Sequence, residues 1–212
     1  MLLTDLDEIC KLGPCPYELG ESEQIYSGPW LGLRQVKFVD PKSGSKGIWE
    51  VAYRTTKPAS ANADGIDIIP ILNEGGKKYL ILVKQYRIPI GGWSLEFPAG
   101  LVDAKESMEA AGIRELREET GFTASKVLLG GVSAGLQHLD PGMSNDSVNF
   151  LTVEVDGKRE EQELAHGEAG LQVVKLEMEG LLERLEKCSS AGLYVEAMLY
   201  TFALGFQLAK NL

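Results

Sequence analysis

The sequence predicts an α+β fold, in which short β-strands occupy most of the chain and helices form its carboxyl-terminal end. Three observations support this prediction. Residues 1–60 contain β-like runs broken by turn sequences, residues 66–87 hold two apolar runs about a turn, and residues 195–210 are apolar enough for a buried helix. With 212 residues, of which 44% are hydrophobic, the chain suffices for one globular domain with an arm.

The charge balance argues against two classes of partner. The chain has 21 Lys and Arg against 31 Asp and Glu, a net charge of −10. Because such a protein repels phosphate backbones, we expect no nucleic-acid partner and no binding to an anionic membrane. Any phosphate group that it handles needs local arginines or a metal ion.

The cysteines and the apolar runs predict a cytoplasmic protein, with a nuclear pool as an extension. Cys10, Cys15 and Cys188 are odd in number and include no Cys-x-x-Cys pair, so neither a disulfide framework nor a thiolate metal site is indicated. The first residues are acidic, and no run approaches the roughly 18 apolar residues of a membrane span.

A domain boundary is expected near residue 60. Two runs rich in β-forming residues, 31–39 and 47–56, predict strands joined by a turn at 40–44. The small, polar stretch 57–65 predicts a connection. The expected domains are therefore a small antiparallel β arm over 1–60 and a larger domain over 61–212.

The larger domain combines strands with helices. Its apolar runs at 66–87 predict a hairpin buried on both faces. Residues 107–120 predict a helix that ends at Gly121. The same rules predict strands at 126–133, 147–155 and near 170–176, a charged loop over 156–168, and two final helices.

The expected helix at 107–120 carries the densest acidic cluster. Glu115 and Glu119 are one turn apart, Glu118 is three residues from Glu115, and Arg114 can reach Glu118. A solvated charged face is one interpretation. However, like charges at this spacing repel, so stability alone does not favour the arrangement. A hard divalent cation would turn the repulsion into binding.

The segment before this helix completes a longer pattern. A strand ending at Glu96-Phe97 turns through Pro98-Ala99-Gly100, where proline lacks an amide hydrogen and glycine tolerates close backbone approach. Gly100 is followed by five residues, Glu106, seven residues, Arg114-Glu115-Leu116, one residue, Glu118-Glu119, one residue, and Gly121-Phe122. This string resembles the Nudix hydrolase signature, and it fills every specified position.

The resemblance implies a Nudix fold, an α/β/α sandwich with a mixed sheet, and hydrolysis of a diphosphate linked to a nucleoside. It implies Mg²⁺, with Mn²⁺ as the alternative and more than one ion per site. Its ligands would be Glu115, Glu119 and the Ala99 carbonyl, with Glu118 binding through water. Gly100, Glu106 and Arg114 would hold the loop and the helix in place.

Four further stretches resemble the ADP-ribose pyrophosphatase (ADP-sugar diphosphatase) branch of this family. They are GPWLGL, IWEVAYRTT, VKQYRIPIGGWSLEFPAG and LDPGMSN. The resemblance implies a domain-swapped homodimer in which Trp30 and Trp49, one from each subunit, sandwich the adenine. Stacking of this kind suits a purine, whereas packing within a strand is the alternative for each tryptophan.

The same resemblance assigns the rest of the site. Arg54 and Arg87 would contact the substrate, with surface ion pairs as the alternative. Glu50, Leu101 and Asp140 would line the pocket, and residues 143–145 would shape its ribose end. Glu168 would be the general base, and the metal ligands Glu115 and Glu119 would complete the catalytic residues. His166 is a rival base, and His138 is expected to be structural or near the rim.

The function expected from these residues is Mg²⁺-dependent hydrolysis of ADP-ribose, and of related ADP-sugars, to AMP and ribose 5-phosphate. The substrate partner is thus a small nucleoside diphosphate sugar. The alternatives are a hydrolase of another nucleoside diphosphate derivative, such as GDP-mannose or 8-oxo-dGDP, and a sensor that binds ADP-ribose without turnover.

Overall fold

The computed structural model describes residues 5–160 and 170–212, and these fall into two compact units. The first unit combines the chain up to Thr56 with residues 139–146, and the second holds residues 57–138 and 147–212. The segment that contains Asp140 therefore packs with the arm, although it lies far from the arm in sequence. Glu168 and His166 lie outside the described residues.

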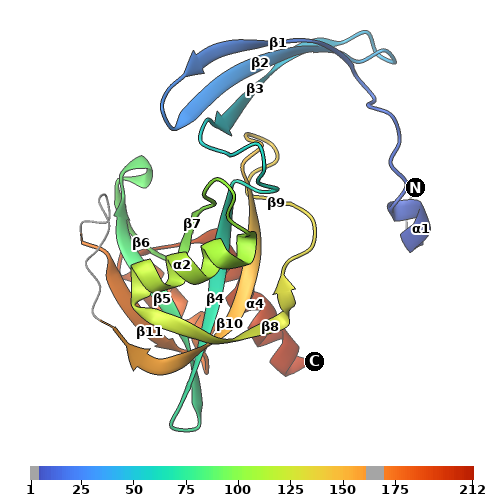
Figure 1. Ribbon diagram of the computed structural model, residues 1–212. Coiled ribbons are helices and arrows are strands. Elements are labelled where there is room, and N and C mark those ends of the chain that lie inside the picture. Colours follow the sequence, from blue (N-terminus) through green and yellow to red (C-terminus); the bar gives the residue numbers. More distant parts are fainter. Residues whose placement is uncertain (1–4, 161–169) are drawn as a thin grey trace. The chain divides into compact units, whose positions relative to one another are not determined.

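The first unit is a three-stranded antiparallel sheet preceded by a short helix, α1 (Leu6–Ile9) (Figure 1). Its strands follow the chain in the order β1 (Glu18–Ser27), β2 (Leu31–Val39) and β3 (Lys46–Arg54). The expected pair β2–β3 is confirmed, with Leu31 opposite Arg54. Strand β1 was not predicted, because all ten of its residues are exposed and leave no apolar pattern. Among the described residues of this unit, only Gly32 is buried.

The second unit is built on a mixed sheet of nine strands within the described residues. Its main path runs β12-β6-β5-β4-β10-β8, while β11 pairs with β5, β7 with β4 and β9 with β10. The strands are β4 (Gly65–Glu74), β5 (Lys77–Arg87), β6 (Gly92–Glu96), β7 (Ala99–Leu101), β8 (Phe122–Val132), β9 (Gln137–His138), β10 (Ser147–Arg159), β11 (Gln172–Glu177) and β12 (Tyr194–Val195). A 3₁₀ turn, η1 (Ile88–Ile90), joins β5 to β6.

Helices cover both faces of this sheet (Figure 1). Helix α2 (Met108–Thr120) packs through Leu116 against β4 and β10. Helices α3 (Leu181–Ser190) and α4 (Ala197–Asn211) pack on the other side. In β5, Ile81 faces the α2 core and Leu80 the α3–α4 core, which confirms burial on both faces. The expected α+β architecture with an antiparallel arm is therefore confirmed.

Two local predictions were wrong. Residues 156–159 were expected in a loop, but β10 continues to Arg159, where it pairs with Phe122 of β8. Residues 98–100 were expected in a turn, but Ala99 and Gly100 belong to β7, which pairs with residues 65–67 of β4. Both elements depend on pairing with a strand distant in sequence, so short-range pattern could not predict them. No described helix is long and apolar enough to span a membrane.

Candidate active site

Helix α2 is fixed at both ends by its own sequence. The Ser107 side chain accepts the amide of Ala110 at 3.2 Å, which satisfies one of the free donors of the first turn. Gly121 ends the helix with φ of 73°, a conformation that glycine adopts without strain. Because Ala111 and Leu116 are buried against the sheet, the rotation of the helix is set as well.

Glu115 and Glu119 both lie against the backbone of Ala99 and Gly100. The Ala99 amide donates to Oε2 of Glu119 at 3.1 Å, and Glu119 is only 6% exposed. A Cβ added to Gly100 would lie under 3.0 Å from the Glu115 carboxyl group. The start of β7 and two successive turns of α2 thus bring together two carboxylates and a backbone segment.

Arg114 ties the loop before α2 to the helix. Its guanidinium donates to both carboxyl oxygens of Glu106, at 3.0 and 2.9 Å, and to the Leu101 carbonyl at 3.1 Å. It also donates to Glu115 at 2.7 Å and to Glu118 at 3.1 Å. The hydrogen bonds from Arg114 lower the pKa of Glu106, and Glu106 is the main cause of the raised pKa of Arg114. Arg114 therefore links three of the four carboxylates of the signature, those of Glu106, Glu115 and Glu118.

Arg87 lies at the end of β5 and is held by Glu96 of β6. Its guanidinium makes three hydrogen bonds to the Glu96 carboxyl group at 2.7 to 3.1 Å, and Gln85 donates to the same group at 3.2 Å. The hydrogen bonds to Glu96 raise the pKa of Arg87. The Arg87 side chain stays 47% exposed, so it can present a positive charge to a ligand while Glu96 fixes it.

Sequence reasoning did not select three buried or partly buried acidic residues around the segment 96–99. They are Asp67 in the apolar strand β4, Glu96 at the end of β6, and Glu196 at the start of α4. Burial, followed by repulsion from Asp67, raises the pKa of Glu196 to about 8. A carboxylate inside an otherwise apolar strand, such as IDIIPIL, was the available signal.

The expected adenine and substrate residues of the arm lie in the first unit. Trp30 is 68% exposed and lies in the β1–β2 turn, whereas Trp49 is 51% exposed and stands opposite Val36 on β2. Glu50 lies on β3 and is exposed. Arg54 forms an ion pair with Asp146 at 2.9 Å, and Asp140 is exposed in a turn where its carboxylate accepts the Gly142 amide at 3.3 Å.

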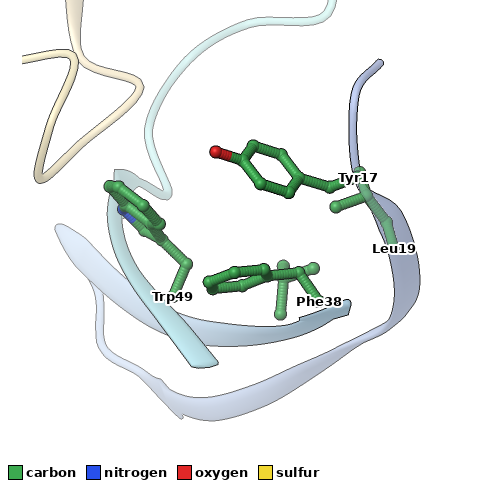
Figure 2. Close-up of a pocket in the computed structure, with 5 residues that line it drawn as sticks. Tyr17, Leu19, Phe38 and Trp49 are labelled. Atoms are coloured by element: carbon green, nitrogen blue, oxygen red, sulfur yellow. The ribbon is translucent and has the colours of Figure 1, made fainter. Parts of the chain in front are cut away.

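Trp49 also closes one side of an aromatic pocket in this unit. Figure 2 shows its ring with those of Tyr17 and Phe38 around the pocket. The pocket has a volume of about 230 Å³, and Leu19 and Val36 complete its lining. The Tyr17 and Phe38 rings meet edge to face with centroids 5.2 Å apart. The indole nitrogen of Trp49 donates to the Gly142 carbonyl at 3.2 Å, so the 139–146 segment orients this ring.

The donors at the start of β7 fit a hard cation. Two carboxylates and a backbone carbonyl are oxygen ligands of the kind that Mg²⁺ and Mn²⁺ accept. Across the described residues, no group of three acidic, His or Cys side chains is already gathered as a metal site. Arg114 forms ion pairs with Glu115 and Glu118.

A family model described as NUDIX domain matches residues 61–190, which is more than half of the chain. The chain belongs to the Nudix hydrolase family. Putative nudix hydrolase 2 of Caenorhabditis elegans is 40% identical over 199 residues, which cover 92% of this chain and 87% of that protein. The ADP-sugar pyrophosphatase of Mus musculus is 32% identical over 211 residues, covering 96% and 94% of the two chains.

Two further comparisons agree with this membership. The ADP-ribose pyrophosphatase of Saccharomyces cerevisiae is 32% identical, covering 86% of this chain and 79% of that protein. A solved structure titled ADP compounds hydrolase superposes with a TM-score of 0.63 at 20% identity, covering 83% of this chain and 86% of that chain. This likeness confirms the Nudix fold. In this Nudix chain, the signature from Gly100 to Phe122 coincides with the cluster of Glu106, Arg114, Glu115 and Glu119 at the start of β7.

Proposed function

We propose that the protein hydrolyses the diphosphate of ADP-ribose and related ADP-sugars to AMP and ribose 5-phosphate, with Mg²⁺ or Mn²⁺ as the cofactor. The observation that carries the proposal is the approach of Glu119 to the Ala99 amide and of Glu115 to Gly100, inside a complete Nudix signature. Similarity over most of the chain to proteins named ADP-sugar pyrophosphatase and ADP-ribose pyrophosphatase supports the substrate class.

In this proposal Glu115, Glu119 and the Ala99 carbonyl would hold the metal, and Glu118 would contact it through water. Bound divalent ions supply charge neutralisation of the diphosphate and a lowered pKa of water. Gly100 leaves room for the Glu115 carboxyl group. Glu106 holds Arg114, which in turn restrains the loop and the helix. Because Arg114 also holds Glu106 through two hydrogen bonds, it would stay anchored if Glu115 bound a metal.

The substrate contacts are assigned by the nature of each side chain. Arg87, fixed by Glu96, suits a diphosphate oxygen because a guanidinium donates two hydrogen bonds in one plane. Arg54, Glu50, Leu101 and Asp140 are proposed to line the rest of the pocket. Glu168 is proposed as the general base and lies outside the described residues, as does its rival His166.

We also propose a homodimer in which each adenine is stacked by Trp30 of one subunit and Trp49 of the other. Along β2, Leu31, which follows Trp30, and Val36, which is paired with Trp49, lie five positions apart, a distance on the order of 17 Å. Rings in contact have centroids only about 4.5 to 7 Å apart. The nearly coreless first unit also supports a partner, because its sheet has only Gly32 buried among the described residues.

Sedimentation of the purified protein tests the dimer. A stable monomer with full activity would remove the shared-tryptophan arrangement. The cytoplasmic location is likewise proposed, and the thiols of Cys10, Cys15 and Cys188 are all free, as a reducing compartment requires. Fractionation of cells with an antibody to the protein tests the location.

Hydrolysis is tested by phosphate release from ADP-ribose after coupling to a phosphatase, with and without Mg²⁺. We expect turnover only with the metal, so equal rates would refute the metal role. A panel of ADP-ribose, GDP-mannose and 8-oxo-dGDP, compared by kcat/KM, tests the substrate. A higher kcat/KM for either of the latter two would overturn the assignment, and tight ADP-ribose binding without turnover would indicate a sensor.

A further inference from the structure

The segment 97–99 accepts or donates hydrogen bonds on both faces of the sheet. On one face Glu119 of α2 accepts the amide of Ala99 at 3.1 Å. On the other face Glu196, the residue that precedes α4, accepts the amide of Phe97 at 3.1 Å. Between these two amides lies Pro98, which has no amide hydrogen, and its carbonyl accepts the amide of Ile68 at 2.8 Å. The whole segment is therefore held by hydrogen bonds.

Glu196 is placed by backbone pairing and does not act as an ordinary helix cap. Strand β12 runs parallel to β6, with Val195 opposite Leu95, and the amide of Glu196 donates to the Leu95 carbonyl at 3.0 Å. The first residue of a helix often uses its side chain to satisfy the free amides of the first turn. The side chain of Glu196 makes no such bond, and its Oε2 instead meets the Phe97 amide.

The surroundings of Glu196 disfavour the ionised form of its carboxyl group. Burial and the neighbouring Asp67 both disfavour a charge on Glu196, and Glu96 adds further repulsion. Arg87 is the cation nearby, and it is already engaged by Glu96. On the other hand, Phe97 is only 2% exposed, so its backbone amide needs a hydrogen-bond acceptor from the protein. The hydrogen bond from the Phe97 amide to Glu196 meets this need, although the position disfavours a charged carboxylate.

Phe97 is also fixed through its ring by the same helix. Its ring meets that of Phe202 on α4 edge to face, with centroids 5.8 Å apart. Helix α4 thus holds both the backbone and the side chain of the residue two positions before Ala99. A helix on the face opposite to α2 is in this way connected to the backbone at the candidate metal site.

We propose that Glu196 is a positioning residue, which sets the place of the Ala99 carbonyl through its hydrogen bond with the Phe97 amide. This rests on the proposed function, because the Ala99 carbonyl matters as a metal ligand. The role requires an acceptor at this position and does not require a charge. Gln should therefore replace Glu196, whereas Ala and the shorter Asp should not.

The experiment compares Glu196→Ala, Glu196→Gln and Glu196→Asp with wild type, and uses Glu186→Ala as the control. Glu186 is an exposed carboxylate on the neighbouring helix α3. Three quantities are measured: amide hydrogen exchange of Phe97 and Ala99 in the metal-free protein by NMR, Mn²⁺ affinity without substrate by electron paramagnetic resonance, and kcat and KM for ADP-ribose.

We expect E196A to speed exchange at Phe97 by about tenfold or more and to weaken Mn²⁺ binding by about tenfold. Its kcat should fall while its KM for ADP-ribose stays close to wild type, because the substrate contacts are intact. E196Q should keep the wild-type exchange rate and Mn²⁺ affinity to within about twofold, and E186A should match wild type in all three measurements.

Two results would overturn the proposal: wild-type exchange and Mn²⁺ affinity in E196A, or equal impairment of E196Q and E196A. If E196A does not fold, the pair E196Q and E196D decides, because Asp keeps the carboxyl group and loses the reach. If wild type fails to hydrolyse ADP-ribose, the proposed function fails, whereas exchange and Mn²⁺ binding still decide the role of Glu196.

Discussion

The carboxyl group of Glu115 occupies the space that any side chain at Gly100 would fill. A Cβ at Gly100 would lie under 3.0 Å from this carboxyl group, so the glycine is required by close approach. No left-handed backbone angle is involved at this position. The Gly100–Glu115 contact joins the first residue of the signature to its central carboxylate.

Gly100→Ala should therefore displace the Glu115 carboxyl group and reduce kcat/KM for ADP-ribose by about a hundredfold, because small misplacements at a reacting centre are costly. Steady-state kinetics measure this effect. Gly157→Ala is the matched control, since a Cβ there would meet nothing within 4 Å. Activity of G100A equal to that of G157A would contradict the requirement for glycine.

Glu119→Gln should reduce kcat by several orders of magnitude without unfolding the protein. The amide side chain can still accept the Ala99 hydrogen bond, yet it removes the negative charge that a divalent cation needs. Kinetics at saturating Mg²⁺ and thermal unfolding would be measured together. Glu109→Gln, on the exposed first turn of the same helix, should behave as wild type, and retained turnover in E119Q would refute the ligand assignment.

Arg114→Lys should lower the free energy of unfolding by about 1 to 3 kcal/mol, since an ammonium group cannot replace a fork that binds Glu106 twice and the Leu101 carbonyl once. Urea denaturation at pH 7 would measure the change. Arg117→Lys, whose exposed pair with Glu160 contributes little, is the control. Equal stability of the two variants would show that the Arg114 network is not needed for folding.

Trp30→Ala and Trp49→Ala should each raise KM for ADP-ribose with little change in kcat, because adenine lies far from the reacting bond. Loss of one stacking face costs about 1 to 3 kcal/mol, which corresponds to about 5-fold to 150-fold in KM. Ile48→Ala, at an exposed neighbouring position on β3, should leave KM unchanged. An unchanged KM in both tryptophan variants would assign them to packing.

Glu196 should make the protein less stable as pH rises from about 5 to 8. Burial raises its pKa in the folded state from 4.5 to about 8, so over this range the folded state retains a proton that the unfolded state has lost. Stability then falls by at most about 1.4 kcal/mol per pH unit. The groups that face it, Asp67, Glu96 and Arg87, remain in both proteins when wild type is compared with Glu196→Gln.

Urea denaturation of wild type and E196Q from pH 5 to 8 measures this slope. The difference in unfolding free energy should change steadily in favour of E196Q across the range. Parallel curves would show that Glu196 titrates in the folded protein as it does in the unfolded chain. The lowered pKa of Glu106 acts only on the acid side, where stability is lost as pH falls, and it is common to both proteins.

Sequence reasoning predicted the elements whose information is local. Helix α2, with Ser107 and Gly121 at its ends, and strands β2 to β5 follow from turn residues and apolar periodicity within a few positions. It also predicted the approach of Arg114 to Glu118, because that contact depends only on helical spacing. The arm strand β1 and the short strand β7 were not predicted, because each is defined by the strand with which it pairs.

By itself the sequence determined the family, because the spacing from Gly100 to Phe122 is a pattern that chance does not produce. Tertiary structure alone decided that Asp67, Glu96 and Glu196, which lie far apart in the chain, surround the segment before Ala99. The physical reason is that strand pairing and helix packing bring these groups together. Burial and repulsion from Asp67 and Glu96 then raise the pKa of Glu196, and this effect cannot be predicted from positions so far apart in the sequence.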